Sequence, residues 1–253
     1  GIIVEPALCA GCGACTTVCP SGALSFATPS ATDQGKRLRT MLTAYAAAGG
    51  QQAALLLHSE GAGAQLLQDL GRAARSDRGT HGLPARVIPV ALWHTASVGL
   101  ELWLSAIAQG ASQVWVLLTA EEAPEYRAAL AEQMAVAQAI LTGLGYAGQH
   151  LRLIEARDAR DLAALDQTLR APAAQGVKEA ARFTALAEKR ATLDLALAHL
   201  LANAPAAGDE IALPTASPLG SLAINTDRCT LCLSCVGACP AQALADNPEL
   251  PQL

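Results

Sequence analysis

Two stretches near opposite ends of the chain carry its eight cysteines and decide the fold. Residues 9–20 read CAGCGACTTVCP, and residues 229–240 read CTLCLSCVGACP. Both space their cysteines as C-x-x-C-x-x-C-x-x-x-C and place proline after the last one. A disulfide framework would spread cysteines through the loops that it joins, whereas none lies between Cys19 and Cys229. The two groups of thiols indicate metal sites in a reducing compartment, and we therefore expect a cytoplasmic location.

The two stretches are copies of one unit at a constant offset of 220 residues, as from Cys9 to Cys229. Each copy predicts a short strand, a cysteine loop, one helical turn that ends at Cys-Pro, and a second short strand. The offset also relates Val4 to Ile224, Pro20 to Pro240, Ala23 to Ala243 and Leu24 to Leu244. With only two copies, we interpret them as halves of one pseudo-symmetric module.

The cysteine spacing suits an iron–sulfur cube. In C-x-x-C-x-x-C the loop wraps one corner of the cube, so that three thiolates reach three irons. Gly11 and Gly13 allow the tight backbone turn that directs N–H groups at the sulfurs. Structural zinc is the alternative, but zinc needs only paired C-x-x-C and gives no role to the third cysteine or the proline.

Both stretches resemble the signature of bacterial ferredoxins that hold two [4Fe-4S] clusters. The resemblance implies crossed ligation, with Cys9, Cys12, Cys15 and Cys239 on one cluster and Cys229, Cys232, Cys235 and Cys19 on the other. It implies a discontinuous ferredoxin-like domain made from residues 1–28 and 221–253. The chain departs from an ordinary ferredoxin because residues 29–220 separate halves that are normally almost adjacent.

The intervening segment alternates apolar strands with helices. Strands are expected at 53–58, 86–93, 113–119 and 150–155, and helices at 33–48, 64–75, 98–109, 125–144 and 161–170. A long helix over 177–202 and an extended return at 211–218 follow. This alternation predicts an α/β domain of three layers, in which a parallel sheet is covered by helices on both faces. The whole chain is thus expected to combine α/β with α+β architecture.

The carboxyl ends of the expected strands are the place where such a domain would bind a ligand. His58, Glu60, His94 and Glu121 lie there and could form a metal or proton-transfer site, or could merely satisfy loop carbonyls and helix termini. The turn at 61–63 could hold a phosphate at a helix N-terminus, but it lacks the third glycine of the dinucleotide fingerprint. Trp93, Trp103 and Trp115 are expected to be core or interface residues.

Charge and hydropathy exclude two classes of partner. The net charge of −5 provides no basic field for nucleic acid. Residues 102–120 are uncharged, but Gln109, Gly110, Ser112 and Gln113 lie at the centre of this stretch, so we expect no membrane span. The chain begins with Gly rather than Met, and we expect it to be a segment of a longer protein.

Residues 87–90, 97–100 and 144–146 also resemble two further groups of proteins. One is a set of large proteobacterial 4Fe-4S proteins associated with formate dehydrogenase, which this chain resembles over its whole length. The other, weaker resemblance is to the delta-subunit domain of methyl-viologen-reducing hydrogenases. That domain has cysteines for a cluster of its own, whereas this one has none, which leaves a scaffold or docking role.

These observations predict an electron-transfer protein, or a segment of one, with two [4Fe-4S] clusters and no independent catalysis. Its expected partner is a redox enzyme, formate dehydrogenase or another oxidoreductase. The alternative is a reductase subunit whose inserted domain binds a flavin, nucleotide or small substrate beside the clusters. A third possibility is an assembly scaffold.

Overall fold

The computed structural model describes residues 3–220, 223–239 and 244–246 of the chain. It divides into two compact units, Gly1–Ser217 and Pro218–Leu253. The larger unit contains the sheet and the N-terminal cysteine stretch, and the smaller contains the C-terminal stretch. Within the described ranges, no helix has the length and apolar character needed to cross a membrane.

The larger unit is built on a parallel sheet of β1 (Ala54–Ser59), β2 (Val87–Leu92), β3 (Gln113–Leu118) and β4 (Leu151–Glu155). The strand order is β2-β1-β3-β4, and every neighbouring pair is parallel. Each residue of the central strands β1 and β3 is buried, as their continuous apolar sequence predicts. The parallel sheet expected from the sequence is therefore confirmed.

The apolar sequence of strand β2 predicts a buried strand, but β2 is an edge strand and only half-buried. Pro89 pairs in register with Leu56 of β1, and its outer side is exposed. An edge strand tolerates proline because the missing N–H would otherwise face solvent rather than another strand.

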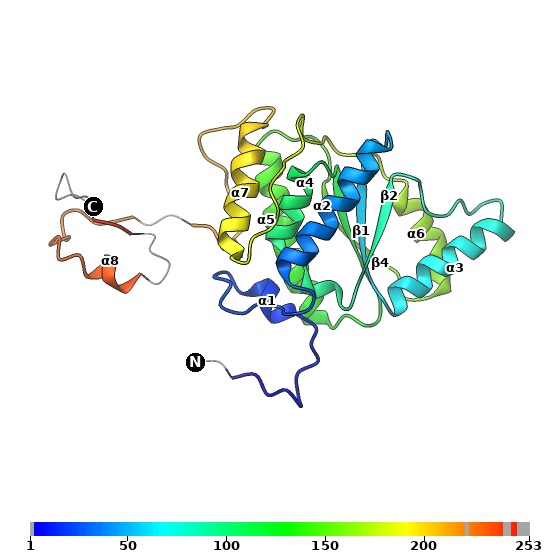
Figure 1. Cartoon of the computed structure of the whole chain (residues 1–253), viewed down its shortest axis with the longest axis horizontal. Helices are drawn as coiled ribbons and strands as arrows, with labels where there is room; N and C mark the ends of the chain where they lie inside the picture. Colours follow the sequence, from blue (N-terminus) through cyan, green and yellow to red (C-terminus); the bar gives the residue numbers. More distant parts are fainter. Residues whose placement is uncertain (1–2, 221–222, 240–243, 247–253) are drawn as a thin grey trace. The chain divides into compact units, whose positions relative to one another are not determined.

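Helices cover both faces of this sheet (Figure 1). On one face, α3 (Ala62–Ser76) packs against β1 and α6 (Leu162–Leu169) packs against β4. Leu66 and Leu70 of α3 form one core with alternate residues of the strands, including Leu56 and Trp115. The opposite face is covered by α4 (Leu100–Ala108) and α5 (Pro124–Gly143), with α2 (Ala31–Ala47) and α7 (Lys189–Ala202) packed against α4. The three layers are as predicted.

The strand order creates a switch point at the carboxyl ends of β1 and β3. From β1 the chain moves outward to β2, and it then returns to the other side of β1 to form β3. Connections leaving β1 and β3 therefore diverge to opposite faces and open a crevice between them, where ligands bind in folds of this kind. A short 3-10 helix, η1 (Thr95–Ser97), follows β2 beside this crevice.

The predicted helix over 177–202 is wrong in its first half, because α7 begins only at Lys189. In the preceding segment, backbone groups form hydrogen bonds with other parts of the domain and not with one another in a helix. Ala181 N–H donates to Ala108 O at 2.8 Å, and the Phe183 carbonyl accepts from the Gln109 side chain at 3.1 Å. These tertiary hydrogen bonds at the end of α4 override a local preference for helix.

The two cysteine stretches form the helical turns that were predicted. They are α1 (Ala14–Val18), with Cys19 at its end, and α8 (Ser234–Ala238), with Cys239 at its end. The flanking short strands are not formed around Val4, Leu24, Ile224 or Leu244, all of which lie in the described residues. A strand requires a ladder partner, and among the residues that the structure describes none pairs with these segments. Pro240 and Ala243 lie outside the described residues.

Candidate metal centre

The two cysteine loops have the same backbone conformation. In the N-terminal loop Gly11 and Gly13 adopt left-handed φ angles of 63° and 75°. The corresponding residues of the C-terminal loop, Leu231 and Leu233, adopt 56° and 57°. The need for this conformation was predicted from the glycines, but its persistence at two leucines was not. An unfavourable conformation kept at non-glycine residues indicates that the loop shape itself is required.

The thiols suit ligation of a cluster. No disulfide joins the eight cysteines, and all are exposed or half-exposed. Gly11 N–H points at Cys9 Sγ at 3.4 Å, as expected for a loop that directs amides at sulfur. The Leu24 amide and then the Ser21 hydroxyl lower the pKa of Cys19 to about 7, and the Ser234 hydroxyl does the same for Cys232. These contacts favour the thiolate, which is the ligating form.

No three Cys, His, Asp or Glu side chains in the described parts of the chain converge closely enough to hold a single metal ion. A [4Fe-4S] cube binds each thiolate at a different iron, so its cysteines stand farther apart than the ligands of one ion. In each loop the first three cysteines lie within seven residues of one another in the sequence. The assignment of Cys19 and Cys239 to particular clusters stays a prediction.

Two family models match the chain. Both are described as a 4Fe-4S binding domain, one over residues 2–24 and the other over residues 222–245. The comparisons with curated proteins and with solved structures return no match. Together with the thiol chemistry and the loop conformation, these matches support two [4Fe-4S] clusters. The cysteine stretches that lie near the two ends of the sequence supply the ligands.

The N-terminal 4Fe-4S loop is docked on the α/β domain beside η1. Thr17 Oγ1 donates to Ala96 O at 2.5 Å, and the Gln133 side chain donates to Thr17 O at 3.0 Å. The backbone of Gly13 lies close to Ser97 of η1, as shown by a Cβ placed on Gly13, which would lie 2.8 Å from Ser97 Cβ. The α/β domain therefore contributes directly to the position of this loop.

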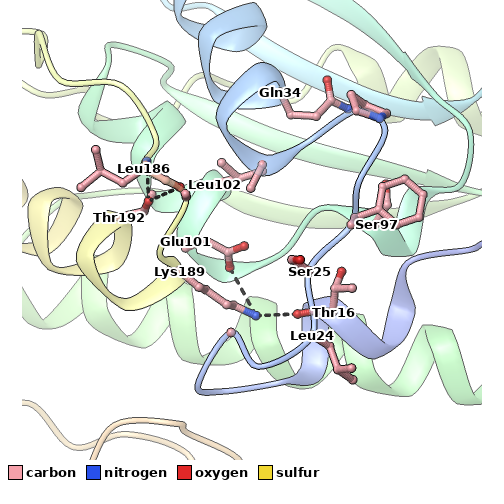
Figure 2. A pocket seen from close by; sticks show the side chains of 15 residues that line it. Thr16, Leu24, Ser25, Gln34, Ser97, Glu101, Leu102, Leu186, Lys189 and Thr192 are labelled. Atoms are coloured by element: carbon pink, nitrogen blue, oxygen red, sulfur yellow. Dashed lines mark hydrogen bonds and ion pairs between the residues drawn. The ribbon is translucent and has the colours of Figure 1, made fainter. Parts of the chain in front are cut away.

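Lys189 at the start of α7 is the main polar anchor of this docking (Figure 2). Its Nζ donates to the carbonyls of Thr16, Thr17 and Cys19 at 2.9, 2.7 and 2.9 Å. Figure 2 shows the bond to Thr16. These are carbonyls at the end of α1, where a positive charge also complements the helix dipole. The sequence offered no signal for Lys189, because it lies about 170 residues from the carbonyls that it binds.

Glu101 lies on the other side of the Lys189 ammonium, with Oε2 3.7 Å from Nζ. Burial raises the pKa of Glu101, and the positive charge of Lys189 opposes that rise. Glu101 Oε2 is buried and has no hydrogen-bond partner in the described structure. A cavity of about 50 Å³ beside the pair, also lined by Ser25 and Gln34, is large enough for a water molecule.

A second cavity, of about 480 Å³ and open to solvent, lies at the carboxyl ends of the strands. It is lined by Ala10, Cys12, Glu60, Gly61, Trp93, His94, Glu121 and Tyr126. Glu60, His94 and Glu121 line this cavity together, as one of the two sequence-based alternatives held. His58 is buried with Nδ1 2.8 Å from Ser59 O, which fits the other alternative, a histidine that satisfies a loop carbonyl. The presence of Cys12 and Tyr126 was not expected. The N-terminal 4Fe-4S loop thus forms one wall of the crevice at the switch point.

The tryptophans divide between the core and this crevice. Trp103 and Trp115 are buried, as predicted for core residues, while Trp93 is 67% exposed. Tyr126 lies at helical spacing from the apolar residues of α5, so the sequence predicts that it joins their stripe, but it is half-buried and meets the cysteine loop instead. The stripe itself is confirmed by burial of Leu130, Met134, Ala137, Leu141 and Leu144.

The helix N-terminus at residues 61–63 is occupied by the protein's own carboxylate. Ala62 N–H donates to Glu121 Oε1 at 3.1 Å, and the Ser59 hydroxyl donates to Oε2. The Ser59 hydrogen bond also lowers the pKa of Glu121, which keeps it ionised. A phosphate at this turn would have to displace Glu121 from the position that favours an anion.

Proposed function

We propose that this chain is an electron-transfer protein, or a segment of one, whose two [4Fe-4S] clusters relay single electrons to or from a partner redox enzyme. The observation that best supports this function is the repeated loop, which has four cysteines and the same left-handed backbone in each of its two copies. The repetition of loop shape at Leu231 and Leu233 supports a cofactor requirement common to both ends of the chain.

We propose that the two ends form one ferredoxin-like module with crossed ligation. Cys19 would ligate the cluster of Cys229, Cys232 and Cys235, and Cys239 that of Cys9, Cys12 and Cys15. Large apolar side chains left exposed within each unit support this joining. Among the described residues in and beside the cysteine loops, these are Ile3, Val4, Leu8 and Val18 in the larger unit, and Ile224, Leu231 and Leu233 in the smaller. Residues 29–220 would then be an insertion in this module.

The residues of this chain would hold and tune the clusters. The bound clusters supply one-electron chemistry. The thiolates ligate, the loop amides direct N–H groups at sulfur, and Lys189 holds the end of α1 through three backbone carbonyls. The α/β domain fixes the N-terminal loop and presents it to a partner. In this proposal the domain positions the N-terminal loop.

The partner is proposed to be a cytoplasmic oxidoreductase. The net charge of −5 favours a partner with a basic docking face. The resemblance of residues 87–90, 97–100 and 144–146 to proteins associated with formate dehydrogenase makes that enzyme the first to test. Reduction of the clusters by a formate dehydrogenase and formate, followed by anaerobic spectroscopy, would support this pairing. Failure of electrons to pass in either direction would exclude it.

The ligation proposal is tested by comparing Cys19→Ala with Cys15→Ala. After anaerobic reconstitution, the wild-type chain should bind about eight iron atoms, as two cubes require. Crossed ligation predicts that the two variants damage different clusters, which electron paramagnetic resonance distinguishes by their reduced-state signals. If both variants lose the same cluster, ligation is not crossed. If the wild-type chain forms no [4Fe-4S] signal, the proposed function is wrong.

A further inference from the structure

Tyr126 is placed to contact the N-terminal cluster from outside the cysteine motif. It lies in the first turn of α5, and its Oη is 3.5 Å from Cys12 Sγ. The two residues are 114 positions apart in sequence and meet in the wall of the crevice at the switch point. The ferredoxin signature specifies the cysteine, but it says nothing about this hydroxyl.

The ring of Tyr126 is held in this position by His94. The two rings meet edge to face, with centroids 5.2 Å apart and an interplanar angle of 89°. His94 is itself oriented by the Ala96 N–H, which donates to its Nδ1 at 3.1 Å. The Ala96 carbonyl accepts from Thr17 of the cysteine loop. One short helix, η1, thus positions both the loop and the tyrosine that meets it.

Ligation of iron decides the direction of the hydrogen bond between Cys12 and Tyr126. A ligating cysteine is a thiolate, which has no proton to donate and can only accept. The tyrosine hydroxyl is then the donor. A hydrogen bond to a cluster sulfur stabilises the reduced cluster more than the oxidised one, because the reduced cluster carries more negative charge on its sulfurs.

The C-terminal loop has a hydroxyl at the corresponding sulfur, but from a different source. Cys232 corresponds to Cys12, and its Sγ lies 3.3 Å from Ser234 Oγ within the same loop. The N-terminal loop has Ala14 where the C-terminal loop has Ser234. The hydroxyl that Ala14 cannot provide is therefore supplied by the α/β domain through Tyr126.

We propose that Tyr126 is a tuning residue of the N-terminal cluster, whose hydroxyl donates a hydrogen bond to the Cys12 thiolate and raises the reduction potential of that cluster. The inference rests on the proposed function, because it requires Cys12 to be a cluster ligand. It assigns the inserted α/β domain a direct part in setting the electron-transfer properties of the protein. Ser234 performs the same task for Cys232 from within its own loop.

The test is an anaerobic redox titration of the reconstituted full chain, followed by electron paramagnetic resonance. Tyr126→Phe should move one of the two midpoint potentials to a more negative value and leave the other unchanged. Ser234→Ala should move the other potential in the same direction. Tyr45→Phe is the matched control, because among the described residues its hydroxyl donates to the Gln51 carbonyl, at 3.1 Å, and to no cysteine, so it should move neither potential.

A second substitution should shift the midpoint potential in the opposite direction, and it keeps the inference testable if Tyr126→Phe loses the cluster. Fluorotyrosine incorporated at position 126 is a stronger donor of the same shape, so at a pH where it remains protonated it should raise the potential that Tyr126→Phe lowers. Titrations of both variants that superimpose on the wild type would overturn the inference, as would an equal shift in Tyr45→Phe. These comparisons require that the reconstituted wild-type chain binds its full iron content. A wild-type chain without clusters would instead overturn the proposed function.

Discussion

Replacing Lys189 by methionine should destabilise the docking of the N-terminal 4Fe-4S loop on the α/β domain. The substitution keeps most of the side-chain volume and removes the charge. It removes the Lys189 donor from three carbonyls at the end of α1, of which Thr17 O keeps the Gln133 side chain as a donor, and it leaves Glu101 without its counter-charge. The side chains of Lys189 and Glu101 are only 16% and 10% exposed, so water replaces the lost ammonium poorly.

The cost of Lys189→Met follows from this burial. Removing one partner of a buried ion pair costs about 3–5 kcal/mol. The lower end applies here, because the neighbouring cavity of about 50 Å³ can admit a water molecule and Glu101 can take up a proton. We therefore expect a loss of about 3 kcal/mol in the free energy of unfolding. Much of that loss is the penalty of burying the Glu101 carboxylate unpaired.

Urea denaturation of the full chain followed by tryptophan fluorescence measures this loss, since Trp93, Trp103 and Trp115 all lie in the larger unit. The double variant Lys189→Met/Glu101→Gln should recover part of the stability, because it no longer buries an unpaired charge. A cost of less than about 1 kcal/mol for Lys189→Met, the range of an exposed ion pair, would contradict a buried pair at this position. A double variant no more stable than Lys189→Met alone would contradict it as well.

Two further predictions concern the same interface. Burial raises the folded pKa of Glu101 above its unfolded value of about 4.3, so its contribution to stability is lost as pH rises through the folded pKa. The wild-type chain should therefore lose stability relative to Glu101→Gln as pH rises above about 4.3, and a constant difference across urea titrations at several pH values would contradict this. Gly13→Ala should cost about 2–4 kcal/mol, since it adds left-handed strain to a contact of 2.8 Å with Ser97 Cβ. Gly11→Ala is the control, because its φ of 63° adds similar left-handed strain while no described atom lies within 4 Å of the added Cβ, and it should cost only about 1–2 kcal/mol. Urea denaturation measures both losses, and equal losses in the two variants would refute the role of docking.

The metal-binding chemistry of this protein could be read from the sequence because it is local. A cysteine loop places three thiolates within seven residues, so spacing alone limits the cofactor that fits. The parallel sheet was equally accessible, because continuous apolar runs such as β1 and β3 are stable only when both faces are covered. The helical turns that end at Cys19 and Cys239 follow from the same local pattern.

Contacts between distant segments were decided only by the tertiary structure. Lys189 binds the end of α1, Glu121 occupies the helix N-terminus at Ala62, and Tyr126 meets Cys12, and each pairing spans more than 50 residues. The late start of α7 has the same origin, because the hydrogen bonds of residues 181 and 183 go to α4. Local patterns specify which groups a segment offers, whereas packing of the whole domain determines which partners they find. For this reason the sequence alone identified the iron–sulfur loops, and only the folded α/β domain revealed the residues that hold the N-terminal one in place.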